Sequence, residues 1–181
     1  MIITISGLPG AGTTTVSQLL QRRLGMDLIS SGEIFRGIAK ELNLSLADFG
    51  KLAQSDPSYD RQIDERQKEL VKTKDNLILE GRLAGHMSLA APPSKKVLRI
   101  LIKAPLETRV RRIMEREKQT SSFKFELAQT KEREESERIR YQTYYFIHLE
   151  DTSIYDLVID SEKLLPEAIV DMISVAAEKM S

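Results

Sequence analysis

Short apolar runs alternate with longer amphipathic segments along this chain of 181 residues. The apolar runs predict five strands, at residues 2–6, 27–30, 76–80, 97–103 and 155–159. The segments between them predict helices at residues 13–24, 33–42, 45–53, 59–72, 105–118, 123–147 and 165–179. Strands that alternate with helices are typical of a parallel sheet with helices on both faces. We therefore expect an α/β fold and a single domain over residues 1–181.

A glycine-rich loop follows the first predicted strand and leads directly into the first predicted helix. It matches the phosphate-binding pattern G-x-x-x-x-G-K-[ST] except at one position, where Thr13 replaces the lysine. Glycines let backbone N–H groups turn inward, and the helix adds its positive N-terminal end. The alternative is a turn that only joins strand to helix. We expect a nucleotide polyphosphate to be bound by Gly7, Leu8, Pro9, Gly10, Ala11, Gly12, Thr13, Thr14 and Thr15.

Composition narrows the possible partners. Lys plus Arg and Asp plus Glu both total 27, so no overall basic field indicates a nucleic acid polymer as partner. The chain has no cysteine, which excludes disulfides, thiolate metal sites and cysteine nucleophiles. No apolar run is long enough to span a membrane, and a strand begins at once near the N-terminus. These features favour a cytoplasmic protein that acts on small molecules, and we expect a monomer.

Polar side chains follow the second and third predicted strands. In open parallel sheets, ligands bind beyond the carboxyl ends of the strands. Ser31 and Arg36 follow the second strand, where a helix cap and a solvated arginine are the alternative interpretation. Glu80 and Arg82 follow the third, where a carboxylate suits a Mg²⁺ site and an arginine suits a phosphate. Glu80 and Arg82 could also be ordinary polar residues at a strand end.

Two late helices carry arginines at helical spacing. Arg133, Glu137 and Arg140 fall on one helix face. The preceding helix has the same spacing in Arg109, Arg112 and Arg116. Solvated helices joined by ion pairs are an equally good interpretation of this spacing alone.

Five motifs occur in an order that resembles the nucleoside monophosphate kinases, most closely the archaeal-type cytidylate kinases. They are the glycine-rich loop, S-S-G-E-I-F-R, E-G-R, A-P-L-E-T-R and K-E-R-E-E-S-E-R-I-R-Y. The resemblance spans nearly the whole chain and implies a P-loop NTPase fold with ATP and Mg²⁺ as cofactors. It implies transfer of the γ-phosphoryl group of ATP to CMP or dCMP. An acceptor-binding helical segment at about residues 33–72 and a lid at about residues 119–140 are expected.

The resemblance also implies roles for single residues. The acceptor would be bound by Ser31, Arg36, Arg82, Arg133, Glu137 and Arg140. Of these, Arg82, Arg133 and Arg140 would act in catalysis, and the lid arginines Arg133 and Arg140 would replace the charge of the missing lysine. Thr14 and Glu80, the latter through water, would hold the metal, and Arg109 would stack on adenine.

The chain departs from the common bacterial form at three positions and in a shorter acceptor-binding region. Thr13, Leu83 and Ser136 stand where that form has lysine, an acidic residue and arginine. Three alternatives stay open. One is a kinase for another acceptor, such as AMP or a hydroxyl-bearing metabolite. A second is a GTPase-like switch, although the chain has no N-K-x-D guanine-binding motif. A third is an inactive nucleotide sensor, which would explain Thr13 but would not need the arginines.

Overall fold

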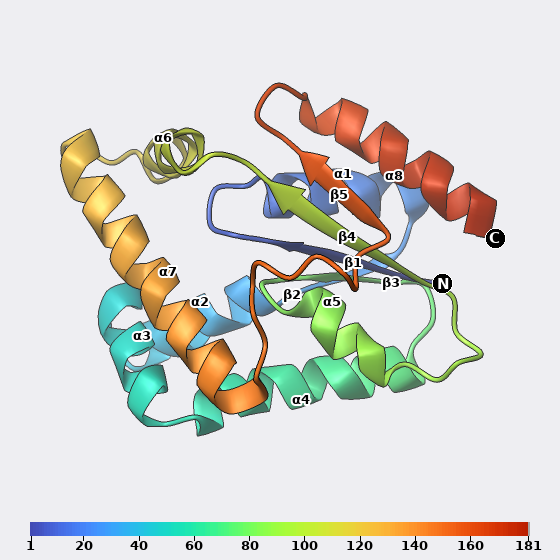
Figure 1. Ribbon diagram of the computed structural model, residues 1–181, viewed down its shortest axis with the longest axis horizontal. Helices are drawn as coiled ribbons and strands as arrows, with labels where there is room; N and C mark the ends of the chain where they lie inside the picture. The colour runs from blue at the N-terminus through green and yellow to red at the C-terminus, as the bar shows by residue number, and fades with distance from the viewer. Residues whose placement is uncertain (181) are drawn as a thin grey trace.

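A computed structural model describes residues 1–180 and confirms a five-stranded parallel sheet with helices on both faces. The strands are β1 (Ile2–Gly7), β2 (Asp27–Ser30), β3 (Leu77–Glu80), β4 (Val97–Lys103) and β5 (Leu157–Asp160). Their order across the sheet is β2-β3-β1-β4-β5, so that β1 lies at the centre (Figure 1).

Helices connect the strands and extend beyond them. The long helices are α1 (Thr13–Leu24), α2 (Ser31–Glu41), α3 (Leu46–Ser55), α4 (Ser58–Thr73), α6 (Leu106–Glu117), α7 (Phe123–Tyr145) and α8 (Pro166–Met180). Two short ones, α5 (Ala84–Met87) and η1 (Ser88–Ala90), follow β3. Within residues 1–180, no helix has the length and apolar character that a membrane span requires.

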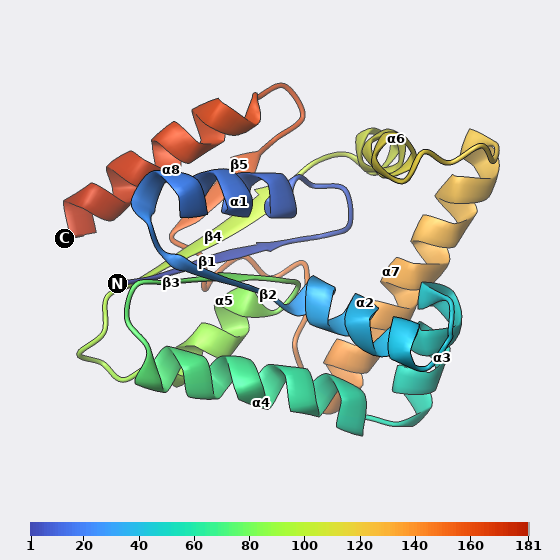
Figure 2. The same ribbon diagram turned by 180° about the vertical axis from the view of Figure 1, so that it is seen from behind.

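The two faces of the sheet are covered by different helices. Helices α1 and α8 lie on one face, and α4 and α5 lie on the other (Figures 1 and 2). Because side chains alternate along a strand, Ile3 and Ile5 of β1 pack in the cluster with α1 and α8, whereas Ile2 packs with Val71 of α4. Burial on both faces explains why the strands are almost continuously apolar.

Helices α2, α3 and α7 gather beyond the carboxyl ends of the strands, at the left in Figure 1. There α3 packs against α7, and α6 packs against α7 as well. Residues 33–72 therefore form three helices, and residues 119–122 are the connection between α6 and α7. Helices α2 and α3 of the predicted acceptor segment and helix α7 of the predicted lid therefore lie at the same edge of the sheet as the glycine-rich loop, whereas α4 covers one face of the sheet.

The predicted bounds differ from the structure in a few places. Strand β3 begins at Leu77, because Asn76 adopts a positive φ of 53° that ends the preceding turn. Strand β5 begins at Leu157, two residues later than predicted. Helix α2 begins at Ser31, since the hydroxyl of Ser30 accepts from the Glu33 N–H and caps it. The capping box of Ser45 and Asp48 is present as predicted.

Candidate active site

The glycine-rich loop adopts the curled backbone that anion binding requires. Gly10 and Gly12 have φ values of 80° and 98°, in the left-handed region that favours glycine. A Cβ atom at Gly10 would also collide with the backbone carbonyl of Arg109. No acidic residue lies in the first turn of α1, so the positive end of this helix is not neutralised by its own side chains. Loop and helix end together present a site suited to phosphate.

Glu80 ends β3 beside this loop and is held by hydroxyl groups. Its Oε1 accepts hydrogen bonds from Thr13 Oγ1 at 2.6 Å and from Thr14 Oγ1 at 3.5 Å. Its Oε2 accepts from Ser30 Oγ. The side chain is only 4% exposed. A carboxylate and a hydroxyl side by side are hard oxygen donors, which fits a Mg²⁺ ion held by few protein groups and by phosphate oxygens.

Ser31 and Arg36 bring the start of α2 to the same place. Ser31 Oγ donates to the Glu80 carbonyl oxygen at 3.2 Å and occupies the space where a Cβ atom of residue 81 would lie, which explains Gly81. Burial lowers the pKa of Arg36, an effect that the charge of Glu80 opposes, and the guanidinium stays cationic. Within residues 1–180 the Arg36 guanidinium makes no hydrogen bond or ion pair, so all its donors are available.

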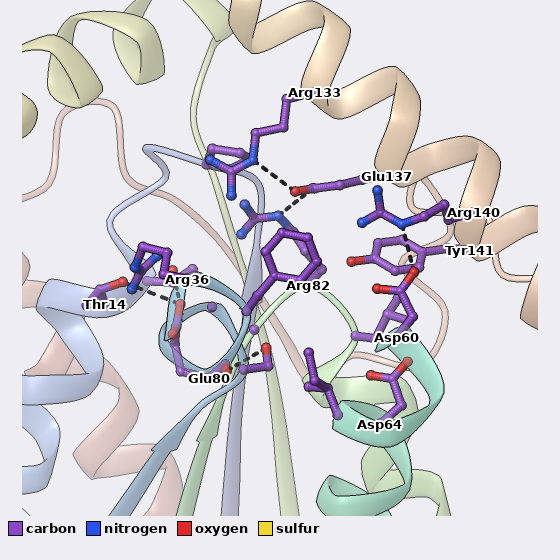
Figure 3. Close-up of a pocket in the computed structure, with 18 of the residues that line it drawn as sticks. Thr14, Arg36, Asp60, Asp64, Glu80, Arg82, Arg133, Glu137, Arg140 and Tyr141 are labelled. Atoms are coloured by element: carbon purple, nitrogen blue, oxygen red, sulfur yellow. Dashed lines mark hydrogen bonds and ion pairs between the residues drawn. The ribbon is translucent and has the colours of Figure 1, made fainter. Parts of the chain in front are cut away.

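Glu137 joins two of the predicted arginines. Its carboxylate accepts from Arg82 Nε at 2.7 Å and from Arg133 Nε at 3.2 Å. Burial alone would raise the pKa of Glu137, but the charges of Arg82 and Arg133 hold it below its ordinary value. Arg82 Nη1 also donates to the Gly7 carbonyl at 3.0 Å. Glu137 therefore orients two guanidinium groups beside the loop, and their remaining donors face the pocket (Figure 3).

Arg140 lines the pocket but is more heavily engaged than we expected. It is only 2% exposed, and its Nε donates to Asp60 Oδ2 at 2.7 Å. Its Nη1 donates to the Gly50 carbonyl at 3.3 Å and to Ser136 Oγ at 3.0 Å. These contacts tie α7 to α3 and α4. The sequence predicted that Arg140 contacts phosphate, whereas in the structure its Nε and Nη1 donate hydrogen bonds to groups of the protein itself.

Arg109 is engaged by the loop and by α7. Its guanidinium donates to the carbonyls of Ala104 and Pro9 and pairs with Glu134, and the residue is only 5% exposed. Arg109 lines one cavity beside the loop, together with Leu8 and Ala11. Arg112 and Arg116 of α6 line another cleft beside the loop, together with Thr14 and Thr15. The stacking role that the resemblance implies for Arg109 stays a prediction.

Two arginines fix α7 to the glycine-rich loop. Arg109 binds the Pro9 carbonyl and Glu134, whereas Arg82 binds the Gly7 carbonyl and Glu137. Both carboxylates belong to α7 and lie one helical turn apart. The loop and the helix are thereby joined at two points.

One pocket brings most of the predicted residues together. Figure 3 shows Thr14 and Glu80 on one side and Asp60 and Asp64 on the other. The lining includes the predicted residues Pro9, Gly10, Thr13, Thr14, Ser31, Arg36, Glu80, Arg82, Arg133, Glu137 and Arg140. It also includes Asp60, Asp64, Tyr141 and Arg116, which our site prediction omitted. Arg116 could have been predicted from the sequence, because its spacing from Arg109 and Arg112 places it on the same helix face.

The sequence of this chain is similar to that of known proteins over nearly its whole length. The model of the cytidylate kinase-like family matches residues 2–163. The cytidylate kinase of Methanosarcina acetivorans is 56% identical over 180 residues, covering 99% of this chain and 98% of that protein. The cytidylate kinase of Methanosarcina barkeri is 54% identical with the same coverage.

Solved structures with low sequence identity share the fold. An uncharacterized protein from Eubacterium ventriosum has a TM-score of 0.70 at 21% identity, with 98% of each chain covered. Shikimate kinase from Bacteroides thetaiotaomicron has a TM-score of 0.62 at 14% identity, again with 98% of each chain covered. At these identities the likeness concerns the fold, which agrees with the predicted P-loop kinase architecture.

Proposed function

The chain belongs to the cytidylate kinase-like family, and on this premise we propose that it transfers the γ-phosphoryl group of ATP to CMP or dCMP. The products are ADP and CDP or dCDP. We further propose that it does so with Mg²⁺, as a cytoplasmic monomer that acts on small molecules. The cytidylate kinases of the two Methanosarcina species support the choice of acceptor, since they align with nearly the whole chain.

The observation that carries this proposal is the shape and charge of one pocket. Residues of the phosphate loop line one end of this pocket, and Asp60, Ile63 and Asp64 of α4 line another part of it. Arg36, Arg82 and Arg133 line the space with donors that the protein itself does not use up. Phosphoryl transfer spreads negative charge over the transferred group and needs positioned cations more than covalent help. Such a pocket suits two phosphorylated ligands that meet end to end.

Each part of the site has a role in this reaction. The loop amides and the N-terminus of α1 hold the donor phosphates, and Arg112 and Arg116 lie along the donor cleft. Thr14 and Glu80 would hold Mg²⁺, which supplies charge to the phosphates when bound. Arg36, Arg82 and Arg133 hold the acceptor phosphate and the transferred group. Glu137 orients Arg82 and Arg133.

We propose that residues 33–72 hold the acceptor and that residues of about 119–140 act as a lid. Helix α7 carries Arg133 and Glu137 over the pocket, so it brings charge to the reacting group and covers it at the same time. Exclusion of water matters because water would otherwise take the phosphoryl group from ATP. Ser31, which lines the same pocket, would contact the acceptor.

A coupled assay with ATP and Mg²⁺ tests the proposal. CMP, dCMP, UMP, AMP and GMP are each offered as acceptor, and kcat/KM is measured for each. We expect CMP and dCMP to be the best acceptors and UMP to be a poor one. Faster turnover of AMP than of CMP would contradict the choice of acceptor, and ATP hydrolysis without transfer would contradict the kinase activity itself.

A further inference from the structure

Arg116, in the last turn of α6, borders two cavities at once. It lines the pocket that contains Arg36 and Arg133, and it also lines the donor cleft beside Arg112. The other residues that line both cavities belong to the phosphate loop and are Gly10, Thr13 and Thr14. Arg116 therefore lies at the junction of the two cavities, where a donor and an acceptor would meet.

The fold uses the other two arginines on this face of α6 but holds Arg116 only loosely. Arg109 is enclosed by its own contacts, and both Nη atoms of Arg112 donate to Ser161, at 2.9 Å and 2.7 Å. The Arg116 side chain is 53% exposed and pairs with the next residue, Glu117, and makes no other ion pair or hydrogen bond within residues 1–180. Exposed pairs of this kind contribute little to stability. Arg116 can thus exchange Glu117 for a ligand at small cost.

Positive charge converges on the pocket from three separate helices. Burial lowers the pKa of Arg36, and the charges of Arg116 and Arg133 lower it further, while the charge of Glu80 opposes this change. The three guanidinium groups are therefore close enough to repel one another across the pocket. A bound polyanion would relieve this repulsion, because its charge would lie between the three cations.

The junction lacks the cation that a phosphate loop usually provides. A lysine at position 13 would bring its charge to the β- and γ-phosphates of the donor. Here Thr13 is buried and donates to Glu80, so it brings no positive charge to the junction. Arg116 borders the same place from α6 and has donors that the protein does not use.

We propose that Arg116 contacts the phosphoryl group during its transfer and supplies the charge that a lysine at position 13 would bring. The inference rests on the proposed function and adds a catalytic residue to it. In the transfer, an acceptor phosphate oxygen bonds to the γ-phosphorus while the bond to the β,γ-bridging oxygen breaks, and ADP keeps that electron pair. Negative charge is spread over the transferred oxygens, which a planar guanidinium can bind with two parallel hydrogen bonds.

The first test compares the wild type with Arg116→Ala and Arg116→Lys. The control is Arg23→Ala, which removes another exposed arginine with an acidic partner, Asp171 of α8. We measure kcat with saturating ATP and CMP, and we measure the Kd for ADP by calorimetry. We expect Arg116→Ala to lower kcat about 100-fold or more and to change the Kd for ADP by less than about twofold. Arg116→Lys should recover part of the loss, since it keeps the charge but not the fork of donors. The control keeps the wild-type values.

A transition-state analogue supplies a second measurement. Aluminium fluoride is added to enzyme with ADP, CMP and Mg²⁺, where it takes the place of the transferred group. We expect it to tighten ADP binding to the wild type, and to do so about 100-fold less for Arg116→Ala. This readout separates contact with the transferred group from an effect on folding or on ADP binding alone.

Three results would overturn the inference in an active wild-type enzyme. They are a wild-type kcat in folded Arg116→Ala, equal tightening by aluminium fluoride in both proteins, and a raised Kd for ADP with unchanged kcat, which would make Arg116 a donor-binding residue only. If the wild type phosphorylates no nucleoside monophosphate, the proposed function itself fails.

Discussion

Thr13 Oγ1 donates a 2.6 Å hydrogen bond to Glu80 Oε1. The residue at the usual lysine position of the phosphate loop is thus directed to a carboxylate at the end of β3. The hydroxyl of Ser30 binds the other oxygen of Glu80. Thr13 therefore positions a group of the proposed metal site, and the positive charge in the pocket comes from arginines on α2, α6 and α7 and from Arg82, which follows β3.

Replacement of Thr13 by lysine tests this arrangement. The Thr13 side chain is almost fully buried, so the new ammonium group would lie against Glu80 and pair with it. We expect Thr13→Lys to give no increase in kcat and to raise the Mg²⁺ concentration needed for half-maximal activity. Steady-state kinetics at varied Mg²⁺, with Thr13→Ser as a control that keeps the hydroxyl, provide the measurement. A large gain in kcat would show that the wild-type site simply lacks charge.

Arg133 is expected to matter for the reaction more than for the fold. Its side chain is 27% exposed, and its Nε alone makes a hydrogen bond, to Glu137. Removal of charge-assisted bonds to the transferred group costs about 2 to 4 kcal/mol, which lowers kcat/KM about 30- to 1000-fold. Arg133→Ala should show this loss with little change in melting temperature. The control is Arg138→Ala, which removes an exposed pair with Glu135; similar kinetics for both variants would argue against a role for Arg133.

Arg140 should behave in the opposite way. Arg140→Ala leaves Asp60 as a buried carboxylate without its partner, and such a loss costs about 3 to 5 kcal/mol of unfolding free energy. Urea unfolding measures this effect, with Arg138→Ala again as the exposed control. A variant with normal stability but much lower kcat/KM would instead assign Arg140 to the reacting phosphates, as the sequence alone suggested.

Burial raises the pKa of Asp64 and thereby makes stability depend on pH. The folded pKa is about 7, against an ordinary value of 3.8, so the folded state binds the proton more tightly than the unfolded state. This contribution is fully present below the unfolded pKa and is lost as the pH rises to about 7. Asp64→Asn cannot titrate, so we expect its stability relative to the wild type to increase by about 2 kcal/mol between pH 5 and pH 8.

Urea unfolding of the wild type and Asp64→Asn at both pH values measures this difference without any ligand. Glu65→Gln, which lies at the surface of the same helix, should show no comparable pH dependence. A difference between Asp64→Asn and the wild type that is the same at both pH values would indicate that Asp64 has an ordinary pKa.

The sequence predicted the sheet and most helices because local signals agreed with the fold. Helix α1 has the predicted bounds, since Gly12 and Gly25 flank it with left-handed backbone. Helices α5 and η1 were missed because they are too short to show a helical period. The family, inferred from five motifs, is confirmed by the match to residues 2–163.

The site was less completely predicted because burial is a tertiary property. Asp60 and Asp64 belong to a strongly charged segment that resembles a solvated helix in sequence, yet both are buried against the pocket. Arg109 and Arg140 have the same residue type and spacing as exposed arginines, and only packing shows that their guanidinium groups are engaged. Spacing identifies the helix face, and the neighbouring elements decide what that face contacts.

The double attachment of α7 to the phosphate loop constrains how the length of this chain can vary. Glu134 and Glu137 reach Arg109 and Arg82 from one face of the helix. One residue inserted just before Glu134 would rotate both carboxylates by about 100° around the helix axis and detach both at once. The connection at residues 119–122 lies before the helix begins, so added residues there can be absorbed without rotating it. Natural and engineered insertions should therefore accumulate at that connection and be absent from the helix around Glu134.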